Sequence, residues 1–326
     1  MNRFDLGLAT FVVAMLALLP LMFPSAAVIN LFTFTLLIAL AAQGWNVLAG
    51  FGGQFSFGHS AFFGAGAYVL ALGQTRFGMT PWIALPLAIA GGALVGLIIG
   101  TLSFRARLRG SYFALVTLAF AEVMRILANS SSATGGAAGI LVPLRISPAN
   151  LQFEDRRLLY WLALAFVAVV LAVTLRISNT RFGAQLAAIR ENEDAARALG
   201  VDVLAVKLKA IALSGAITAA AGCLYVQKFL YLDANIGFGS WISVEALLAP
   251  IIGGLGTALG PLVGAIVLLG LGEATKTGLH AVTGDTLPGV DLVLFGVILI
   301  LCVGFAPRGI LGVTDNARRA RSGGPA

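Results

Sequence analysis

Residues 176–209, RISNTRFGAQLAAIRENEDAARALGVDVLAVKLK, hold ten of the 35 charged side chains in the chain. Long apolar regions lie on both sides, and neither 158–175 nor 210–227 contains an Asp, Glu, Lys or Arg. A polar stretch between two such regions predicts a water-exposed loop between membrane spans. We expect a soluble partner to bind to this loop.

The composition of the chain is that of a membrane protein. Of the 326 residues, 59% are hydrophobic and 11% are charged, whereas a soluble domain has about 25% charged residues. Because one helical span needs about 20 apolar residues, we predict an all-α polytopic membrane protein. It forms a single domain, residues 1–326, with about ten spans. The expected spans are 6–23, 26–48, 60–75, 82–103, 111–128, 158–175, 210–230, 242–258, 261–279 and 289–306.

The distribution of basic residues predicts the orientation of these spans. If every segment crosses the membrane, fourteen Lys and Arg residues lie on the side of the 176–209 loop and six lie on the other. The positive-inside rule then places this loop, both termini and the basic tail 307–326 in the cytoplasm. The 60–75 segment is short, and if it is re-entrant the topology before it reverses. The first apolar segment has no clear cleavage site, so we expect a retained helix.

A glycine-rich break interrupts the longest uncharged region. Residues 44–68 read GWNVLAGFGGQFSFGHSAFFGAGAY. Irregular backbone at membrane depth occurs only where protein or a water-filled cavity satisfies its polar groups, and such interrupted segments often mark a transport path. Helix packing by small residues is the alternative interpretation. The polar groups available for a path are those of Gln54, Ser56, His59 and Ser60.

The charged loop itself contains a predicted helix. Residues 184–199 are good helix formers, with apolar residues interleaved among charges, and Gly200 stands where a helix would end. A short amphipathic helix of this kind suits a groove on a partner protein. The alternative is a helix lying on lipid headgroups, which its acidic residues disfavour.

Three further sequence patterns predict a close helix contact, an ion pair and an external docking segment. Gly92, Gly96 and Gly100 recur every four residues and predict a face on which another helix approaches closely. Glu122 and Arg125 are three residues apart, so they can pair on one helical face, either as a structural ion pair or as part of a path. Residues 129–157 form the longest segment without a helical pattern on the outer side, where an external partner could dock.

Several functional classes are disfavoured. The glycine-rich segment 245–264 lacks the strand and the Lys of a phosphate-binding loop, so we predict a second broken helix or a tight membrane turn instead of a nucleotide site. Cys223 and Cys302 both lie in apolar regions, which argues against a disulfide or a metal site. The basic residues are dispersed among the spans, which argues against binding to nucleic acid. We expect no cofactor and no catalytic residue.

Three blocks of sequence together resemble the permeases of the branched-chain amino acid ABC importers, of the LivM type. They are GFGGQFSFGHSAFFGAGAY near residue 50, LRGSYFALVTLAFAEVMR with TGGAAGI near 108–140, and FGAQLAAIRENEDAARALGVDVLAVKLKAIALSGAITAAAGCLY with IIGGLGTALGP and FAPRGILG. The resemblance implies a permease subunit in the bacterial inner membrane. Its implied partners are membrane lipid, a second LivH-like permease, two cytoplasmic ATPases and an external binding protein.

The resemblance also assigns the 184–200 region to contact with the ATPase. In such importers an E-A-A pattern followed by Gly marks a coupling helix, and this chain has Asp194 where Glu is usual and Ser214 where many importers carry Pro. The implied coupling residues are Arg190, Glu191, Glu193, Asp194, Ala195, Ala196 and Gly200, and the candidate path residues are Gln54, Ser56, His59, Ser60 and Glu122.

The predicted function is half of a translocation path for leucine, isoleucine or valine, with ATP hydrolysed by partner chains. Relatives that carry urea, short amides or aromatic acids are the nearest alternative. An ion-coupled secondary transporter is a less favoured one, because Glu122 is the one serious candidate for an intramembrane ion ligand.

Overall fold

The computed structural model describes residues 3–283 together with Val290, Val293, Gly296, Val297, Ile300, Gly304 and Gly309–Leu311. The expected span 289–306 and the tail 307–326 therefore lie largely outside the described residues. The helices are α1 (Arg3–Met22), α2 (Ala26–Asn46), α3 (His59–Thr75), α4 (Pro81–Arg105), α5 (Gly110–Ser130), α6 (Arg156–Ile177), α7 (Arg181–Glu191), α8 (Glu193–Ala198), α9 (Val203–Phe229), α10 (Ala234–Gly237), α11 (Ser240–Gly253) and α12 (Gly260–Thr283).

Short elements connect or extend these helices. A π-helix, η1 (Val47–Phe51), continues α2, and strand β1 (Ile140–Leu141) pairs antiparallel with β2 (Tyr231–Leu232). The pairing ties the 129–157 segment to the chain that follows α9. Three single 3-10 turns complete the 129–157 segment: Ser132–Thr134, Gly136–Ala138 and Pro148–Asn150.

The prediction of an all-α membrane protein is confirmed, but the count of about ten spans is not. Among the described residues, six helices are long and apolar enough to cross a membrane, and Leu6–Met22 is a shorter apolar helix. The shortfall arises partly because α3 begins at a break within the bundle and is only 17 residues long. The six are Ala26–Phe51, Pro81–Arg105, Gly110–Ser130, Arg156–Ile177, Val203–Phe229 and Ala234–Gly253.

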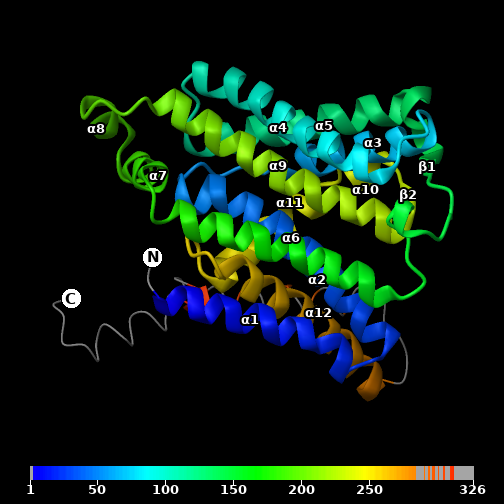
Figure 1. The fold of residues 1–326 in the computed structure, drawn as a ribbon. Helices are drawn as coiled ribbons and strands as arrows, with labels where there is room; N and C mark the ends of the chain where they lie inside the picture. Colours follow the sequence, from blue (N-terminus) through cyan, green and yellow to red (C-terminus); the bar gives the residue numbers. More distant parts are fainter. Residues whose placement is uncertain are drawn as a thin grey trace.

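The helices run roughly side by side, so the bundle has two distinct ends (Figure 1). One end carries α7 and α8 and the start of α1, and the other carries β1 and β2. The 52–75 segment joins these ends, because Gly53 lies against Arg190 of α7 whereas Arg76 donates to the Ser132 carbonyl at 2.8 Å. The α3 helix, 17 residues long, therefore runs toward the end that carries β1 and β2.

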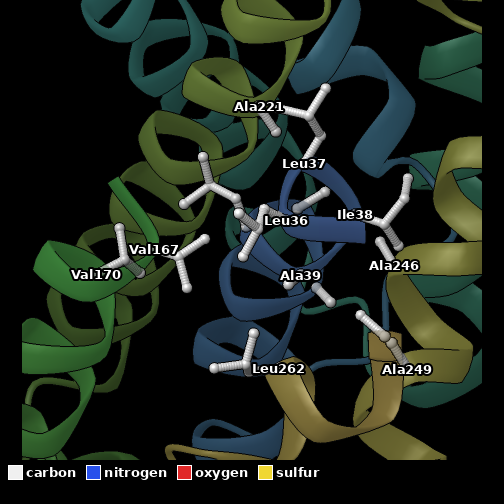
Figure 2. Close-up of a cluster of buried hydrophobic side chains, with 14 of the residues drawn as sticks. Leu36, Leu37, Ile38, Ala39, Val167, Val170, Ala221, Ala246, Ala249 and Leu262 are labelled. Atoms are coloured by element: carbon white, nitrogen blue, oxygen red, sulfur yellow. The ribbon is translucent and has the colours of Figure 1, made fainter. Parts of the chain in front are cut away.

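The core is built around α2. Residues 35–52 are all buried, as expected for a helix that is apolar on every face. Figure 2 shows the side chains of Leu36 to Ala39 reaching α6, α9, α11 and α12 on different sides of α2. The labelled neighbours are Val167, Val170, Ala221, Ala246, Ala249 and Leu262.

Two side chains of α6 hold α1 to the bundle at a proline. Pro20 has no N–H, so it cannot donate to the Leu16 carbonyl four residues earlier. Tyr160 donates its hydroxyl to that carbonyl at 2.6 Å, and Trp161 Nε1 donates to the Ala17 carbonyl at 3.1 Å. Backbone acceptors around the proline are thus satisfied from the neighbouring helix, as an apolar environment requires.

The glycine face of α4 packs against α9 as predicted. A Cβ on Gly96 would lie 2.7 Å from the Ile211 carbonyl oxygen, and one on Gly92 would lie 2.7 Å from the Gly215 carbonyl oxygen. Gly100 faces the Ile211 side chain. Only glycine permits such a close backbone approach between the two helices.

We predict that Gly96→Ala lowers the stability of the protein in detergent by about 1–3 kcal/mol, because the added methyl overpacks the α4–α9 contact. The matched control is Gly91→Ala on the same helix, whose Cβ would meet only a Val69 methyl at 3.4 Å. Thermal unfolding followed by intrinsic fluorescence measures both. Equal midpoints for the two variants would contradict the close contact.

Candidate functional site

The first break separates α2 from α3, where η1 and the residues 52–58 replace regular helix. Trp45 Nε1 donates to the Ser56 carbonyl at 2.8 Å, and the Phe57 N–H donates to Thr117 Oγ1 at 3.2 Å. These bonds replace those that a helix would supply, since hydrocarbon offers no water to irregular backbone. The prediction of a broken segment in residues 44–68 is confirmed.

The first turn of α3 gathers buried polar groups from three helices. His59 Nε2 and Ser214 Oγ of α9 lie 2.8 Å apart, and the Ser60 N–H donates to Ser243 Oγ of α11 at 2.9 Å. The first N–H groups of a helix have no helical acceptor, so Ser243 satisfies one of them. His59 and Ser60 are both fully buried.

This polar cluster lies well inside the bundle. Ser214 is eleven residues along α9 from Val203, which corresponds to about 16 Å from the start of that helix. Ser56 is fully buried too, whereas Phe55 and Phe57 on either side of it are each 40% exposed. In the described conformation, other parts of the protein therefore cover Ser56, whereas Phe55 and Phe57 remain partly exposed.

The second break, residues 254–259, joins α11 to α12 as predicted for the 245–264 segment. Gly254 and Gly256 have φ values of +135° and +75°, which an L side chain would strain. Asn46 reaches this loop from the end of α2: its Nδ2 donates to the Thr257 carbonyl at 2.8 Å and its Oδ1 accepts from the Gly256 N–H at 2.9 Å. One amide side chain therefore holds the two breaks together.

The charged loop differs from its prediction in two ways. The single helix expected over 184–199 is wrong: α7 and α8 are separated at Asn192, which is extended with φ −157°. Asn192 Oδ1 accepts from the N–H groups of Asp194 and Ala195, each at 3.0 Å. This N-cap interaction competes with continued helix and begins α8.

The second difference is at the end of the loop. Gly200 adopts φ +85° and the Val201 N–H donates to the Ala196 carbonyl at 3.1 Å, so α8 ends in the motif that a C-terminal glycine favours. Asp202 then caps α9, accepting from the Ala205 N–H at 3.0 Å. The predicted loop, residues 176–209, extended too far, because α9 begins at Val203. Lys207 and Lys209 therefore lie in α9 and not in the loop.

A cluster of ion pairs fixes α8 against the neighbouring helices. Glu193 lies 2.6 Å from Lys207 Nζ and 3.3 Å from Arg109 Nε, and Asp194 accepts two hydrogen bonds from Arg109, at 3.0 and 3.1 Å. The paired guanidinium of Arg109 holds the pKa of Asp194 below its usual value. Arg197 also pairs with both carboxylates. Glu193 and Asp194 therefore contact this chain itself.

The outward side of the loop is different in character. Leu199 is 84% exposed at the tip of α8, and Ala195 and Glu191 are exposed as well. Ala196 points the other way and is buried. An exposed leucine on a rigidly anchored helix is suited to insertion into a pocket on another protein.

Arg190 is the coupling candidate that points into the permease. Its Nη1 donates to the Gly50 carbonyl in η1 at 2.9 Å. Gly50 and Arg190 are far apart in sequence, and the sequence offered no signal for this contact.

The structure brings together four of the five candidate path residues. Gln54, Ser56, His59 and Ser60 lie along the first break, but Glu122 lies on α5, where it is exposed and accepts from Arg125 Nε at 2.9 Å. Sequence reasoning missed the residues that complete the site, since each is an isolated polar position among mostly apolar neighbours and belongs to no motif. They are Asn46, Thr117, Ser214 and Ser243.

Cys223 is buried and free, whereas Cys302 lies outside the described residues. Within the described part of the chain, no group of three or more His, Cys, Asp or Glu side chains comes together. The arrangement as a whole defines a multi-pass helical membrane protein with two adjoining broken segments and a helical loop anchored at one end.

Comparison with known proteins identifies the family. Residues 27–303 match the family described as "branched-chain amino acid transport system / permease component", and the chain belongs to it. It is 28% identical to the high-affinity branched-chain amino acid transport system permease protein LivM of Salmonella typhimurium, over 90% of this chain and 72% of the relative. The LivM protein of Escherichia coli is also 28% identical, over 92% and 73%.

Relatives of lower identity carry the permease names LivH and BraD. The LivH protein of Escherichia coli is 25% identical, over 84% of this chain and 91% of its own length. The BraD protein of Pseudomonas aeruginosa is 27% identical over the same two fractions. No solved structure matches the chain.

We predict that Asn46→Ala destabilises the protein by about 1–3 kcal/mol for each backbone group left unpaired at Gly256 and Thr257. Asn30→Ala is the matched control, because Asn30 is an exposed asparagine of the same helix and is expected to change stability by less than about 0.5 kcal/mol. Detergent-based thermal unfolding compares the two. An unchanged midpoint for Asn46→Ala would show that the breaks are held by other contacts.

Proposed function

We propose that this chain is the LivM-type permease subunit of an ATP-binding cassette importer and forms half of a translocation path for aliphatic amino acids. The observation that carries this proposal is a break well inside the helical bundle, with buried polar groups, in a protein whose exposed helical loop is anchored at one end. The family relationship supports branched-chain amino acids as the substrate class, since its members carry that description.

The open side of the first break supports a paired arrangement. Irregular backbone within the membrane does not face lipid, yet Phe55 and Phe57 are each 40% exposed beside it. A second permease subunit, of the LivH type, would cover this side and complete the path. Apolar walls with Ser56, His59 and Ser60 nearby suit a small zwitterion with an aliphatic side chain.

The anchored loop supports energy input from outside the chain. We place α7 and α8 on the cytoplasmic side with both termini, in the bacterial inner membrane. One of the two ATPase subunits would bind the exposed face around Leu199, and an external binding protein would deliver substrate at the opposite end, where residues 129–157 lie. ATP-driven closure of the ATPases would then move the spans between inward-facing and outward-facing states.

The central test is uptake by the complete complex in proteoliposomes. The chain is co-expressed with its LivH-type partner, the ATPases and the binding protein, and labelled leucine, isoleucine or valine is supplied from outside. The proposal predicts uptake that requires enclosed ATP and persists with an ionophore. Uptake of urea, amides or aromatic acids instead would keep the mechanism and replace the substrate. Uptake that an ionophore abolishes and ATP depletion does not would identify an ion-coupled transporter.

We predict that Leu199→Glu prevents the ATPases from co-purifying with the permease, because it places a charge where an apolar contact is expected. Losing one buried leucine contact of about 1.5–3 kcal/mol corresponds to weakening of about tenfold or more. Leu199→Met preserves size and polarity and is the matched control. Normal co-purification of the Leu199→Glu variant would exclude this surface as the docking site.

A further inference from the structure

The last turn of α7 lies directly against the first break. A Cβ on Gly53 would come within 2.7 Å of Arg190 Cγ and 3.2 Å of Arg190 Cα, so the two backbones are in close contact. One turn earlier, the Leu186 side chain lies against Gly52, where an added Cβ would be 3.2 Å from Leu186 Cδ2. The α7 helix is therefore packed onto the residues that follow η1, and the absence of a side chain on Gly53 permits this contact.

The Arg190 guanidinium occupies the point where the two breaks meet. Its Nη1 donates to the Gly50 carbonyl at 2.9 Å, and a Cβ on Gly256 would lie 3.2 Å from that same nitrogen and 3.0 Å from the Gly50 oxygen. Asn46 binds the backbone of Gly256 from the other side. One cation of the loop thus touches both irregular segments.

The chemistry of this contact favours arginine specifically. The last carbonyls of a helix have no helical donor and carry partial negative charge, and Gly50 lies near the end of η1. A guanidinium is planar, stays charged and has several donors in a fixed geometry, whereas an ammonium is a compact point charge. Lysine would keep the charge at this position but not the shape.

The two helices of the loop are anchored to different parts of the permease. The α8 helix is held by Arg109, which precedes α5, and by Lys207 of α9. The α7 helix is held to the first break through Arg190, whose guanidinium also lies beside Gly256 of the second break. Asn192 interrupts the helix between them, so the two anchors lie on separate rigid pieces.

We propose that Arg190 is a positioning residue that transmits movement of the α7–α8 loop to both broken segments, and that it does not act as a contact for the ATPase. This proposal rests on the proposed function, since it requires a partner that moves the loop. Removing Arg190 should leave assembly and ATP hydrolysis in place and separate them from transport. A residue needed only for folding would instead lower both activities together.

The test measures leucine uptake and ATP hydrolysis on the same reconstituted importer for the wild type, Arg190→Ala, Arg190→Lys and Arg181→Ala. Arg181 is an exposed arginine at the start of the same helix and controls for loss of charge. We expect Arg190→Ala to reduce uptake per ATP hydrolysed by about tenfold, the effect of losing one charged hydrogen bond. Arg190→Lys should be intermediate, Arg181→Ala should match the wild type, and the concentration of loaded binding protein giving half-maximal hydrolysis should not change.

A wild-type ratio of uptake to hydrolysis in Arg190→Ala would overturn the proposal, as would equal losses in Arg181→Ala. If the Arg190→Ala complex does not assemble, Arg190→Lys decides: a lowered ratio supports the proposal and a wild-type ratio overturns it. Failure of the wild type to take up any aliphatic amino acid with ATP would instead refute the proposed function, and this inference with it.

Discussion

The structure depends on one constraint: backbone that leaves the helix inside a membrane must find its hydrogen bonds within the protein. The chain leaves helical geometry at residues 52–58 and again at 254–259. Asn46, at the end of α2 beside the first break, binds the backbone of the second break. Arg190 of α7 donates a hydrogen bond to Gly50 of η1. Because these bonds are shared, neither segment is independent of the other or of α7.

The packing of the bundle follows from holding these breaks at its centre. Residues 35–52, which include the second half of α2 and all of η1, are buried, so the first break follows directly from the core. The glycine face of α4 brings α9 close on one flank, and α9 in turn presents Ser214 to His59. The glycines permit the close approach of α4 and α9. The hydroxyl groups of Ser214 and Ser243 then provide hydrogen-bond partners for the first turn of α3.

Much of this architecture could be predicted because it follows from local composition. The breaks, the glycine face of α4 and the exposed position of the charged loop each had a sequence signal. The separation of α7 from α8 did not, because good helix formers surround Asn192 and only its side-chain cap ends the helix. Nor could composition reveal that Arg190 faces Gly50 or that Lys207 is buried against Glu193, since these contacts join distant segments.

If the first break lines the translocation path, its buried polar groups become accessible to water during transport, and a cysteine at Ser56 reports that change. Ser56 is fully buried in the described conformation, and the native cysteines, Cys223 and Cys302, are first replaced by serine. The reconstituted importer is then treated with a membrane-impermeant maleimide, with and without ATP and loaded binding protein. We predict slow labelling at rest and labelling faster by about tenfold or more during turnover, as a population shift of about 1.4 kcal/mol would give. An equal rate under both conditions would show that this break is a fixed structural element and that the substrate passes elsewhere.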